Sequence, residues 1–201
     1  PDERVDIELD SLIEEFKAVA KPKWIMREFT LKNLELLGTN LVLKGESIKK
    51  LLESCQSVVL FATTLGRDIE TLLSRYSKSN ISKAILADSV ASAAIEDICE
   101  EIEYEIKVEK SKESLYLTDR FSPGYGDMDI SQSAEICKVL DTERKIGLTT
   151  SNTGIMIPRK SVNAIIGISK ENQSFRARGC GNCMMRPHCE FRKKGVVCYA
   201  T

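Results

Sequence analysis

One long apolar stripe in the middle of the chain constrains the fold more than any other feature of the sequence. Between about residues 81 and 106, apolar side chains recur at intervals of three and four residues. This is the period of an amphipathic α-helix, so we predict a single helix over that length. The stripe consists of Ile81, Ala84, Ile85, Ala91, Ile95, Ile98, Ile102 and Ile106.

A carboxylate interrupts this stripe at Asp88, and Ser92 lies beside the stripe one turn further on. A carboxylate on the buried face of a helix is costly unless it is paired or hydrogen-bonded. We therefore expect Asp88 to have a partner. That partner is either a salt bridge or capping contact with a neighbouring loop, or a bound ligand.

The rest of the chain mixes strand and helix patterns without a strict strand–helix–strand order. We therefore expect an α+β domain with a mixed or antiparallel sheet and one long helix. We place this domain at residues 1–170, with a cysteine-rich basic tail at residues 171–201. Strands are predicted at 40–44, 57–64, 146–151 and 162–169, and further helices at 7–20, 48–54, about 67–77 and 131–140.

Composition argues against several classes of protein. Lys and Arg number 29 against 30 Asp and Glu, so the net charge of −1 draws the chain to neither nucleic acid nor membrane. No apolar run reaches the ~20 residues of a membrane-spanning helix, and the polar opening Pro1–Arg4 lacks the pattern of a signal peptide. The absence of G-x-G-x-x-G and Walker sequences argues against dinucleotides and nucleoside triphosphates. We expect a cytoplasmic protein.

A short segment after the long helix combines a cation, two glycines, a proline and an aromatic ring. It reads Arg120-Phe121-Ser122-Pro123-Gly124-Tyr125-Gly126-Asp127. Glycine and proline disfavour both strand and helix here, which suits a rigid loop whose backbone can approach a ligand closely. Arg120 would then bind a carboxylate or phosphate. The alternative is an ordinary Pro-Gly turn with a solvated arginine.

Four of the seven cysteines crowd the last part of the chain. Cys180, Cys183, Cys189 and Cys198 have the spacing C-x2-C-x5-C-x8-C. Four thiolates can hold zinc or an iron–sulfur cluster, and His188 could replace one of them at zinc. The alternative is a set of reduced thiols or adventitious disulfides. The other cysteines, Cys55, Cys99 and Cys137, lie in apolar patterns and are predicted to be small core residues.

The same tail is locally basic. This charge indicates either a solvated surface or a docking site for an acidic redox protein, such as a flavodoxin, or for a corrinoid partner. His188 is the only histidine, so no catalytic triad can form elsewhere in the chain. The basic residues are Lys170, Arg176, Arg178, Arg186, Arg192, Lys193 and Lys194.

Three segments together resemble one known family. Residues 120–126 resemble the R-x-x-x-G-Y signature of the activation domain of cobalamin-dependent methionine synthase. Residues 146–150 and 156–164 resemble that family's Leu-Thr and M-x-P-x-x-S-V-S-G segments, with Asn163 and Ala164 in place of the final Ser-Gly. The resemblance covers about residues 80 to 170.

The resemblance implies binding of S-adenosylmethionine. It implies that Arg120 contacts the methionine carboxylate, that Ser122, Pro123 and Gly124 offer backbone contacts, and that Tyr125 packs at the pocket edge. The family places acidic residues for the ligand's ammonium at the positions of Ser92 and Ser114, where this chain has none. We expect a carboxylate from an adjacent turn to compensate, with Asp88, Glu96 and Glu113 as candidates.

The resemblance also implies a function without catalytic residues in this chain. The domain would assist the reductive methylation of an inactive cobalamin, carried by a separate methionine synthase or related corrinoid protein. The chain lacks the D-x-H-x-x-G cobalamin-ligand motif, so we expect it to act in trans, as one component of a methyltransferase system. The alternative is an electron-transfer or interaction protein that keeps the fold, has lost S-adenosylmethionine binding and uses the cysteine tail.

Overall fold

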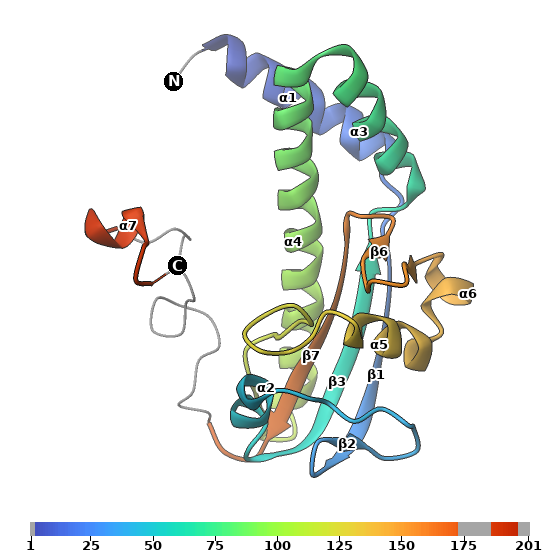
Figure 1. Ribbon diagram of the computed structural model, residues 1–201, viewed down its shortest axis with the longest axis vertical. Helices are drawn as coiled ribbons and strands as arrows, with labels where there is room; N and C mark the ends of the chain where they lie inside the picture. Colours follow the sequence, from blue (N-terminus) through green and yellow to red (C-terminus); the bar gives the residue numbers. More distant parts are fainter. Residues whose placement is uncertain (1–2, 173–185, 197–201) are drawn as a thin grey trace.

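The computed structural model describes residues 3–172 and 186–196, and within them it contains one main sheet (Figure 1). Every pairing in this sheet is antiparallel, which confirms the α+β prediction. The strand order is β2-β1-β3-β7-β4. These strands are β1 (Lys23–Lys32), β2 (Glu35–Leu36), β3 (Cys55–Thr64), β4 (Tyr116–Leu117) and β7 (Ser161–Ser169).

The centre of the sheet is formed by β3 and β7. Both strands are buried over most of their length, because helices and loops cover both faces of the sheet. These are the strands predicted at 57–64 and 162–169. The neighbouring strand β1 was not predicted, and only Phe29 within it is fully buried. The strand predicted at 40–44 is wrong, since the segment makes only a single bridge between Val42 and Glu35.

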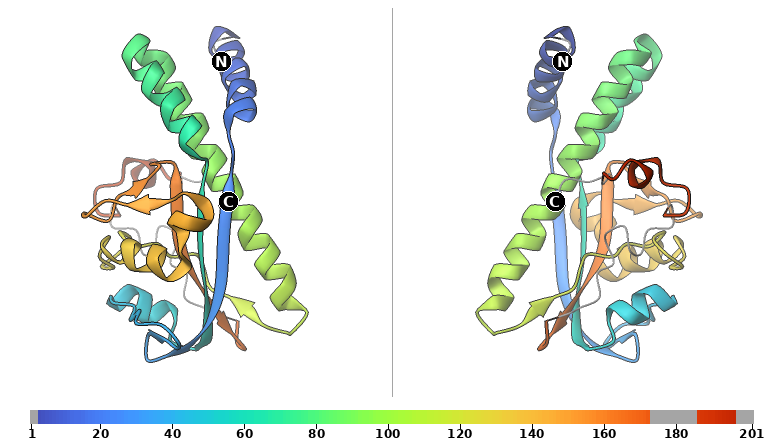
Figure 2. Two further views of the ribbon diagram at one scale, coloured as in Figure 1. Left: turned by 90° about the vertical axis from the view of Figure 1, so that its right-hand side faces the viewer. Right: turned by 90° about the vertical axis from the view of Figure 1, so that its left-hand side faces the viewer.

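One face of the sheet is covered by the long helix α4 (Ile81–Ser111). Its second half crosses the sheet, as Figure 2 shows. Cys99, Ile102 and Ile106 form a core there with side chains of the two central strands. The predicted long helix is therefore confirmed, and it continues one turn beyond the predicted end.

The opposite face carries three shorter helices, α2 (Glu46–Leu51), α5 (Gln132–Leu140) and α6 (Thr142–Ile146). Figure 2 shows them on the side of the sheet away from α4. They enclose a larger core, which also receives Phe121 and Met128 from the loop that follows β4. A separate small hairpin, β5 (Thr149–Thr150) with β6 (Met156–Ile157), replaces the longer strand predicted at 146–151.

Beyond the sheet, helices α1 (Glu3–Val19) and α3 (Arg67–Ser79) pack against the first half of α4 (Figure 1). The predicted apolar stripe is wrong at two positions in this half, because Ile81 is 75% exposed and Ile85 is 64% exposed. Ala91 of the stripe is buried as predicted, and Ala87 is buried beside it, so that small side chains let the helices approach closely. Asp88 is therefore not on a buried face of the helix.

The described residues end with a short helix, α7 (Glu190–Lys193). The predicted division between a domain at 1–170 and a tail at 171–201 stays a prediction, because residues 173–185 and 197–201 are not described. No helix in the described part of the chain has both the length and the apolar character that a bilayer span requires.

Candidate functional site

The Arg120 loop begins at the edge of the sheet. Just after β4, the Thr118 hydroxyl accepts a hydrogen bond of 2.9 Å from the N–H of Gly167 in β7. Phe121 and Ile165 then exchange two backbone hydrogen bonds of 3.0 and 2.8 Å. Phe121 enters the core on the side of α2 and α5, whereas the preceding residue, Arg120, pairs with α4 on the other side of the sheet. Successive side chains of an extended backbone point to opposite faces of a sheet, so Arg120 points toward α4 while Phe121 points to the other face.

The Arg120 side chain is buried, with only 8% of its surface exposed, and it bonds to two carboxylates of α4. Its Nη2 lies 2.5 Å from Oε2 of Glu96, and its Nε lies 3.1 Å from Oε1 of Glu103. The two glutamates are separated by two helical turns and therefore share one side of α4. The alternative of a solvated arginine in an ordinary turn is therefore wrong.

The third guanidinium nitrogen of Arg120 has no partner. Among the residues that the structure describes, Nη1 is the one buried side-chain nitrogen or oxygen without a hydrogen bond. A buried donor left unpaired is costly, so this N–H group is available to an acceptor on a ligand.

The surroundings of Arg120 keep its guanidinium group protonated. Burial lowers the pKa of the guanidinium, but the neighbouring Cys99, Glu103 and Glu96 raise it more. The net pKa lies above the usual value, so the side chain remains a cation. A buried cation with one open donor and two flanking carboxylates can bind both ends of a zwitterion.

The residues after Phe121 form a closed turn. The N–H of Gly124 donates to the carbonyl of Met128 at 2.9 Å, and the N–H of Tyr125 donates to the carbonyl of Ser122 at 3.1 Å. Gly124 has a φ of 92°, in the left-handed region that favours glycine. Pro123, within the turn, is buried.

The Tyr125 ring is 64% exposed and lies 6.3 Å from the Phe121 ring, between centroids. The ring therefore lies at the surface of the loop. Contacts of Ser122, Pro123, Gly124 and Tyr125 with a ligand stay predictions.

The acidic residues weighed as compensating groups lie in different places. Asp88 is 60% exposed and pairs with Lys160 at 2.8 Å, which confirms the expected ion-pair partner. Ser92 accepts a hydrogen bond of 2.8 Å from the same ammonium group. Because an α-helix rises ~1.5 Å per residue, Asp88 lies about 12 Å along the axis from Glu96. Of the three acidic candidates, Glu96 is the one that contacts Arg120, and a ligand contact of Asp88 stays a prediction.

At the far end of α4, Glu113 lies 3.8 Å from the Lys110 ammonium group. That lysine also pairs with Glu28 of β1 at 2.7 Å. Ser114 follows in a turn with a φ of 57° and is exposed. Glu113 is therefore engaged with a lysine.

Sequence reasoning missed Glu103. The only signal in the sequence was its spacing of seven residues from Glu96, which places the two carboxylates on one side of a helix. Which loop faces that side depends on the path of the chain after β4, and no local pattern shows this.

The cysteine site lies mostly outside the described residues. Cys180, Cys183 and Cys198 fall in the segments that are not described, while Cys189 is half-buried. No cluster of three or more potential metal ligands occurs within residues 3–172 and 186–196. The four-cysteine metal site therefore stays a prediction.

The three cysteines predicted to be core residues are at least partly buried. Cys99 and Cys137 are buried, and Cys55 is half-buried. Burial raises the pKa of the Cys55 thiol to about 11, so it remains protonated at neutral pH. The burial of Cys99 and Cys137 and the partial burial of Cys55 agree with the prediction that these residues are small core side chains.

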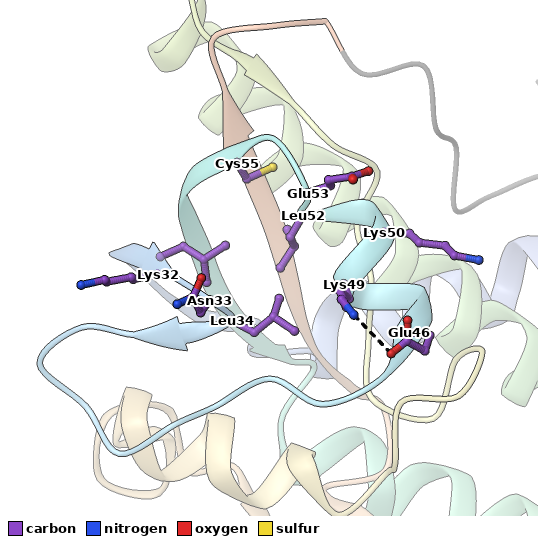
Figure 3. A pocket seen from close by; sticks show the side chains of 10 residues that line it. Lys32, Asn33, Leu34, Glu46, Lys49, Lys50, Leu52, Glu53 and Cys55 are labelled. Atoms are coloured by element: carbon purple, nitrogen blue, oxygen red, sulfur yellow. Dashed lines mark ion pairs between the residues drawn. The ribbon is translucent and has the colours of Figure 1, made fainter.

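A different part of the surface contains a cavity of about 610 Å³, shown in Figure 3. It lies between α2 and the turn that joins β1 to β2. Lys49 and Glu46, both on α2, form an exposed ion pair of 3.6 Å on one side of it. Exposed pairs of this kind are well hydrated, so they attract a ligand less than a buried unpaired donor does. We therefore place the candidate site at Arg120. The cavity is lined by Leu31, Lys32, Asn33, Leu34, Glu46, Lys49, Lys50, Leu52, Glu53 and Cys55.

Comparison with known proteins relates the chain to one family and to a solved structure. Residues 47–186 match the family described as "Vitamin B12 dependent methionine synthase, activation domain". The fold is similar to that of a solved structure, the MetH reactivation domain bound to AdoHcy, with a TM-score of 0.61 and 15% sequence identity. The alignment covers 97% of this chain and 75% of that chain, and at this identity it shows a shared fold. No curated protein matches the sequence.

Proposed function

Because the chain belongs to the family of vitamin B12-dependent methionine synthase activation domains, we propose that it binds S-adenosylmethionine at the Arg120 loop. We further propose that it presents this ligand to a cobalamin-dependent methionine synthase, or a related corrinoid protein, for reductive reactivation. The observation that carries the proposal is the buried Arg120 guanidinium with its one unpaired nitrogen.

The charges around Arg120 suit this ligand. One guanidinium and two carboxylates leave a single net negative charge at the site. S-adenosylmethionine carries a carboxylate, an ammonium and a sulfonium, and therefore a single net positive charge. S-adenosylhomocysteine lacks the sulfonium and is neutral overall. The site is therefore expected to favour the methyl donor over its demethylated product.

Each group has a separate role in this proposal. Nη1 of Arg120 donates a hydrogen bond to the ligand carboxylate, because it is the guanidinium nitrogen that has no hydrogen-bond partner among the described residues. Glu96 is 53% exposed and can turn from Arg120 toward the ligand ammonium, whereas Glu103 is only 25% exposed and stays on Arg120. Glu96 thus takes the part that the family gives to acidic residues at the positions of Ser92 and Ser114.

The turn at Gly124 and Tyr125 would hold the adenosine part. Both residues are exposed, so a ligand bound there would remain open to a partner. The cobalamin of the partner supplies the reduced cobalt that accepts the methyl group, after an external donor gives one electron. This chain's own part is to bind the ligand, orient it and leave its methyl group accessible.

Titration calorimetry tests the binding step. Wild-type protein is expected to bind S-adenosylmethionine, and Arg120→Ala is expected to lose binding by about tenfold or more, because a charge-assisted contact is removed. Arg159→Ala is the matched control, since Arg159 is 66% exposed and pairs with Glu70 on α3. Equal affinity of wild type and Arg120→Ala would remove the proposal.

A second assay tests the reactivation step. A methionine synthase that lacks its activation region is held as cob(II)alamin with a one-electron reductant and S-adenosylmethionine. Adding this chain is expected to produce the absorption spectrum of methylcobalamin, and adding Arg120→Ala is not. If the cobalamin spectrum stays unchanged when the wild-type protein is added to its cognate corrinoid partner, the in-trans role is contradicted.

A further inference from the structure

The loop that contains Arg120 is tied to a distant part of the chain by Asp127. Its Oδ2 accepts a hydrogen bond of 2.6 Å from the N–H of Glu46, and its Oδ1 accepts one of 2.9 Å from the N–H of Ser47. These two residues form the start of α2, whose own N-cap residue, Gly45, has no side chain to satisfy them. Asp127 therefore caps a helix that lies about 80 residues earlier in the sequence.

The loop and the start of α2 also pack closely against each other at two glycines. A Cβ atom added to Gly126 would lie 2.6 Å from the Ser47 hydroxyl oxygen and 3.0 Å from its Cβ. A Cβ atom added to Gly45 would lie 3.2 Å from Oδ1 of Asp127. Gly126 has a φ of 55° and Gly45 a φ of 135°. The absence of side chains at both glycines is what brings the carboxylate within reach of the two N–H groups.

The loop is thereby held at both ends. At one end, Phe121 is fixed by its two hydrogen bonds to Ile165. At the other end, Met128 is buried in the core next to Asp127. Between them lie the three residues expected to offer backbone contacts to the ligand, followed by Tyr125, and Asp127 is the side chain that fixes the distal end of this span.

We propose that Asp127 is a positioning residue, which sets the backbone of residues 122–126 for ligand binding by anchoring it to α2. This rests on the proposed function of the Arg120 loop. Asp127 does not contact the ligand in this proposal. It acts by keeping the turn in its bound geometry, so that Arg120 and the turn can bind the same molecule without first being ordered.

The experiment measures ligand affinity and amide hydrogen exchange in the full chain with the Asp127→Ala and Asp127→Asn variants. The probe is S-adenosylmethionine. Asp127→Ala is expected to raise Kd by about tenfold, because charged acceptor bonds to two N–H groups are lost. Asp127→Asn keeps one acceptor oxygen and is expected to raise Kd less. Amide exchange at Ser47, Gly124 and Tyr125 should accelerate in the same order.

Asp129→Asn is the matched control. Asp129 is also an exposed aspartate, and it accepts a hydrogen bond of 2.7 Å from the N–H of Ser131, but this contact is local and does not reach α2. The control is expected to leave Kd and exchange at residues 122–126 unchanged. A Kd that is the same for wild type and Asp127→Ala, with both folded by circular dichroism, would overturn the inference. So would an equal effect of Asp129→Asn.

Failure of the proposed function gives a different result. If the wild-type chain does not bind S-adenosylmethionine, the exchange measurement decides the remaining question. Faster exchange of residues 122–126 in Asp127→Ala alone would support the anchoring role without this ligand. Unchanged exchange would overturn the anchoring role as well.

Discussion

The guanidinium of Arg120 and the carboxylate of Glu103 form an ion pair in which Nε and Oε1 lie 3.1 Å apart. The pair joins the edge of the sheet to the middle of α4, and Glu96 extends it toward the surface. Because Glu103 is the more buried of the two glutamates, it neutralises Arg120 permanently. Glu96 is exposed enough to change partner when a ligand arrives.

The first prediction concerns ligand selectivity. Glu96→Gln removes one negative charge from the site and is expected to weaken the binding of S-adenosylmethionine more than that of S-adenosylhomocysteine. We expect the ratio of the two affinities to fall by about fivefold to tenfold, as for a partly exposed charged contact. Competition calorimetry measures this ratio. Glu101→Gln, on an exposed part of the same helix, is the control. An unchanged ratio in Glu96→Gln would contradict the role of this residue.

The second prediction concerns the contact between the loop and α2. Gly126→Ala and Gly147→Ala both place a side chain at a left-handed residue, with φ of 55° and 70°. Each is expected to lose about 1–2 kcal/mol of the free energy of unfolding for this reason. Gly126→Ala is expected to lose about 1–3 kcal/mol more, because its Cβ meets Ser47 whereas Gly147 has open space around it. Urea unfolding gives both values, and equal losses would refute the close approach.

Acid stability provides a third prediction. The Ser47 N–H and hydroxyl and the Glu46 N–H lower the pKa of Asp127 to about 2, from an ordinary value of 3.8. The pKa of Asp127 is lower in the folded chain than in the unfolded chain. Its hydrogen bonds to α2 therefore stabilise the fold fully above pH 3.8, and this stabilisation is lost as the pH falls toward 2. Asp127→Asn should therefore flatten this part of the pH dependence of the urea midpoint. An identical pH dependence in wild type and variant would exclude the cap.

The fourth prediction concerns Lys160, whose side chain is 16% exposed and pairs with Asp88 and Ser92. Replacing Lys160 with methionine leaves Asp88 exposed to water, so the loss in the free energy of unfolding should be modest. We expect Lys160→Met to lower the free energy of unfolding by about 1 kcal/mol. Lys49→Met, at an exposed pair, should change it by less than about 0.5 kcal/mol. A larger effect at Lys49 would contradict this ranking.

The elements that were predictable from the sequence are those whose own residues make the pattern. Val58 to Thr64 and the buried run of β7 are apolar on both faces, so each indicates a central strand. The strand β1 escaped notice because Phe29 is its only fully buried side chain. The stripe of α4 was misplaced at Ile81 and Ile85, because α1 and α3 cover the side of α4 that carries Ala87 and Ala91 and leave these two residues exposed.

The candidate site was predictable only in part. Arg120 was found because glycine and proline mark its loop as special. Its partner Glu103 and the anchoring role of Asp127 depend on which distant elements meet, and such contacts leave no mark in local sequence. Asp88 drew attention as a charge within an apolar stripe, yet its exposed pairing with Lys160 shows that the stripe was placed on the wrong face there.

The most direct test of the central claim compares S-adenosylmethionine with its decarboxylated analogue, each titrated into wild type and Arg120→Ala. If the guanidinium binds the carboxylate, wild type prefers the carboxylate-bearing ligand by about tenfold or more, and Arg120→Ala binds the two equally. Equal affinity of the wild-type chain for both ligands would contradict the account, as would a preference that survives in Arg120→Ala.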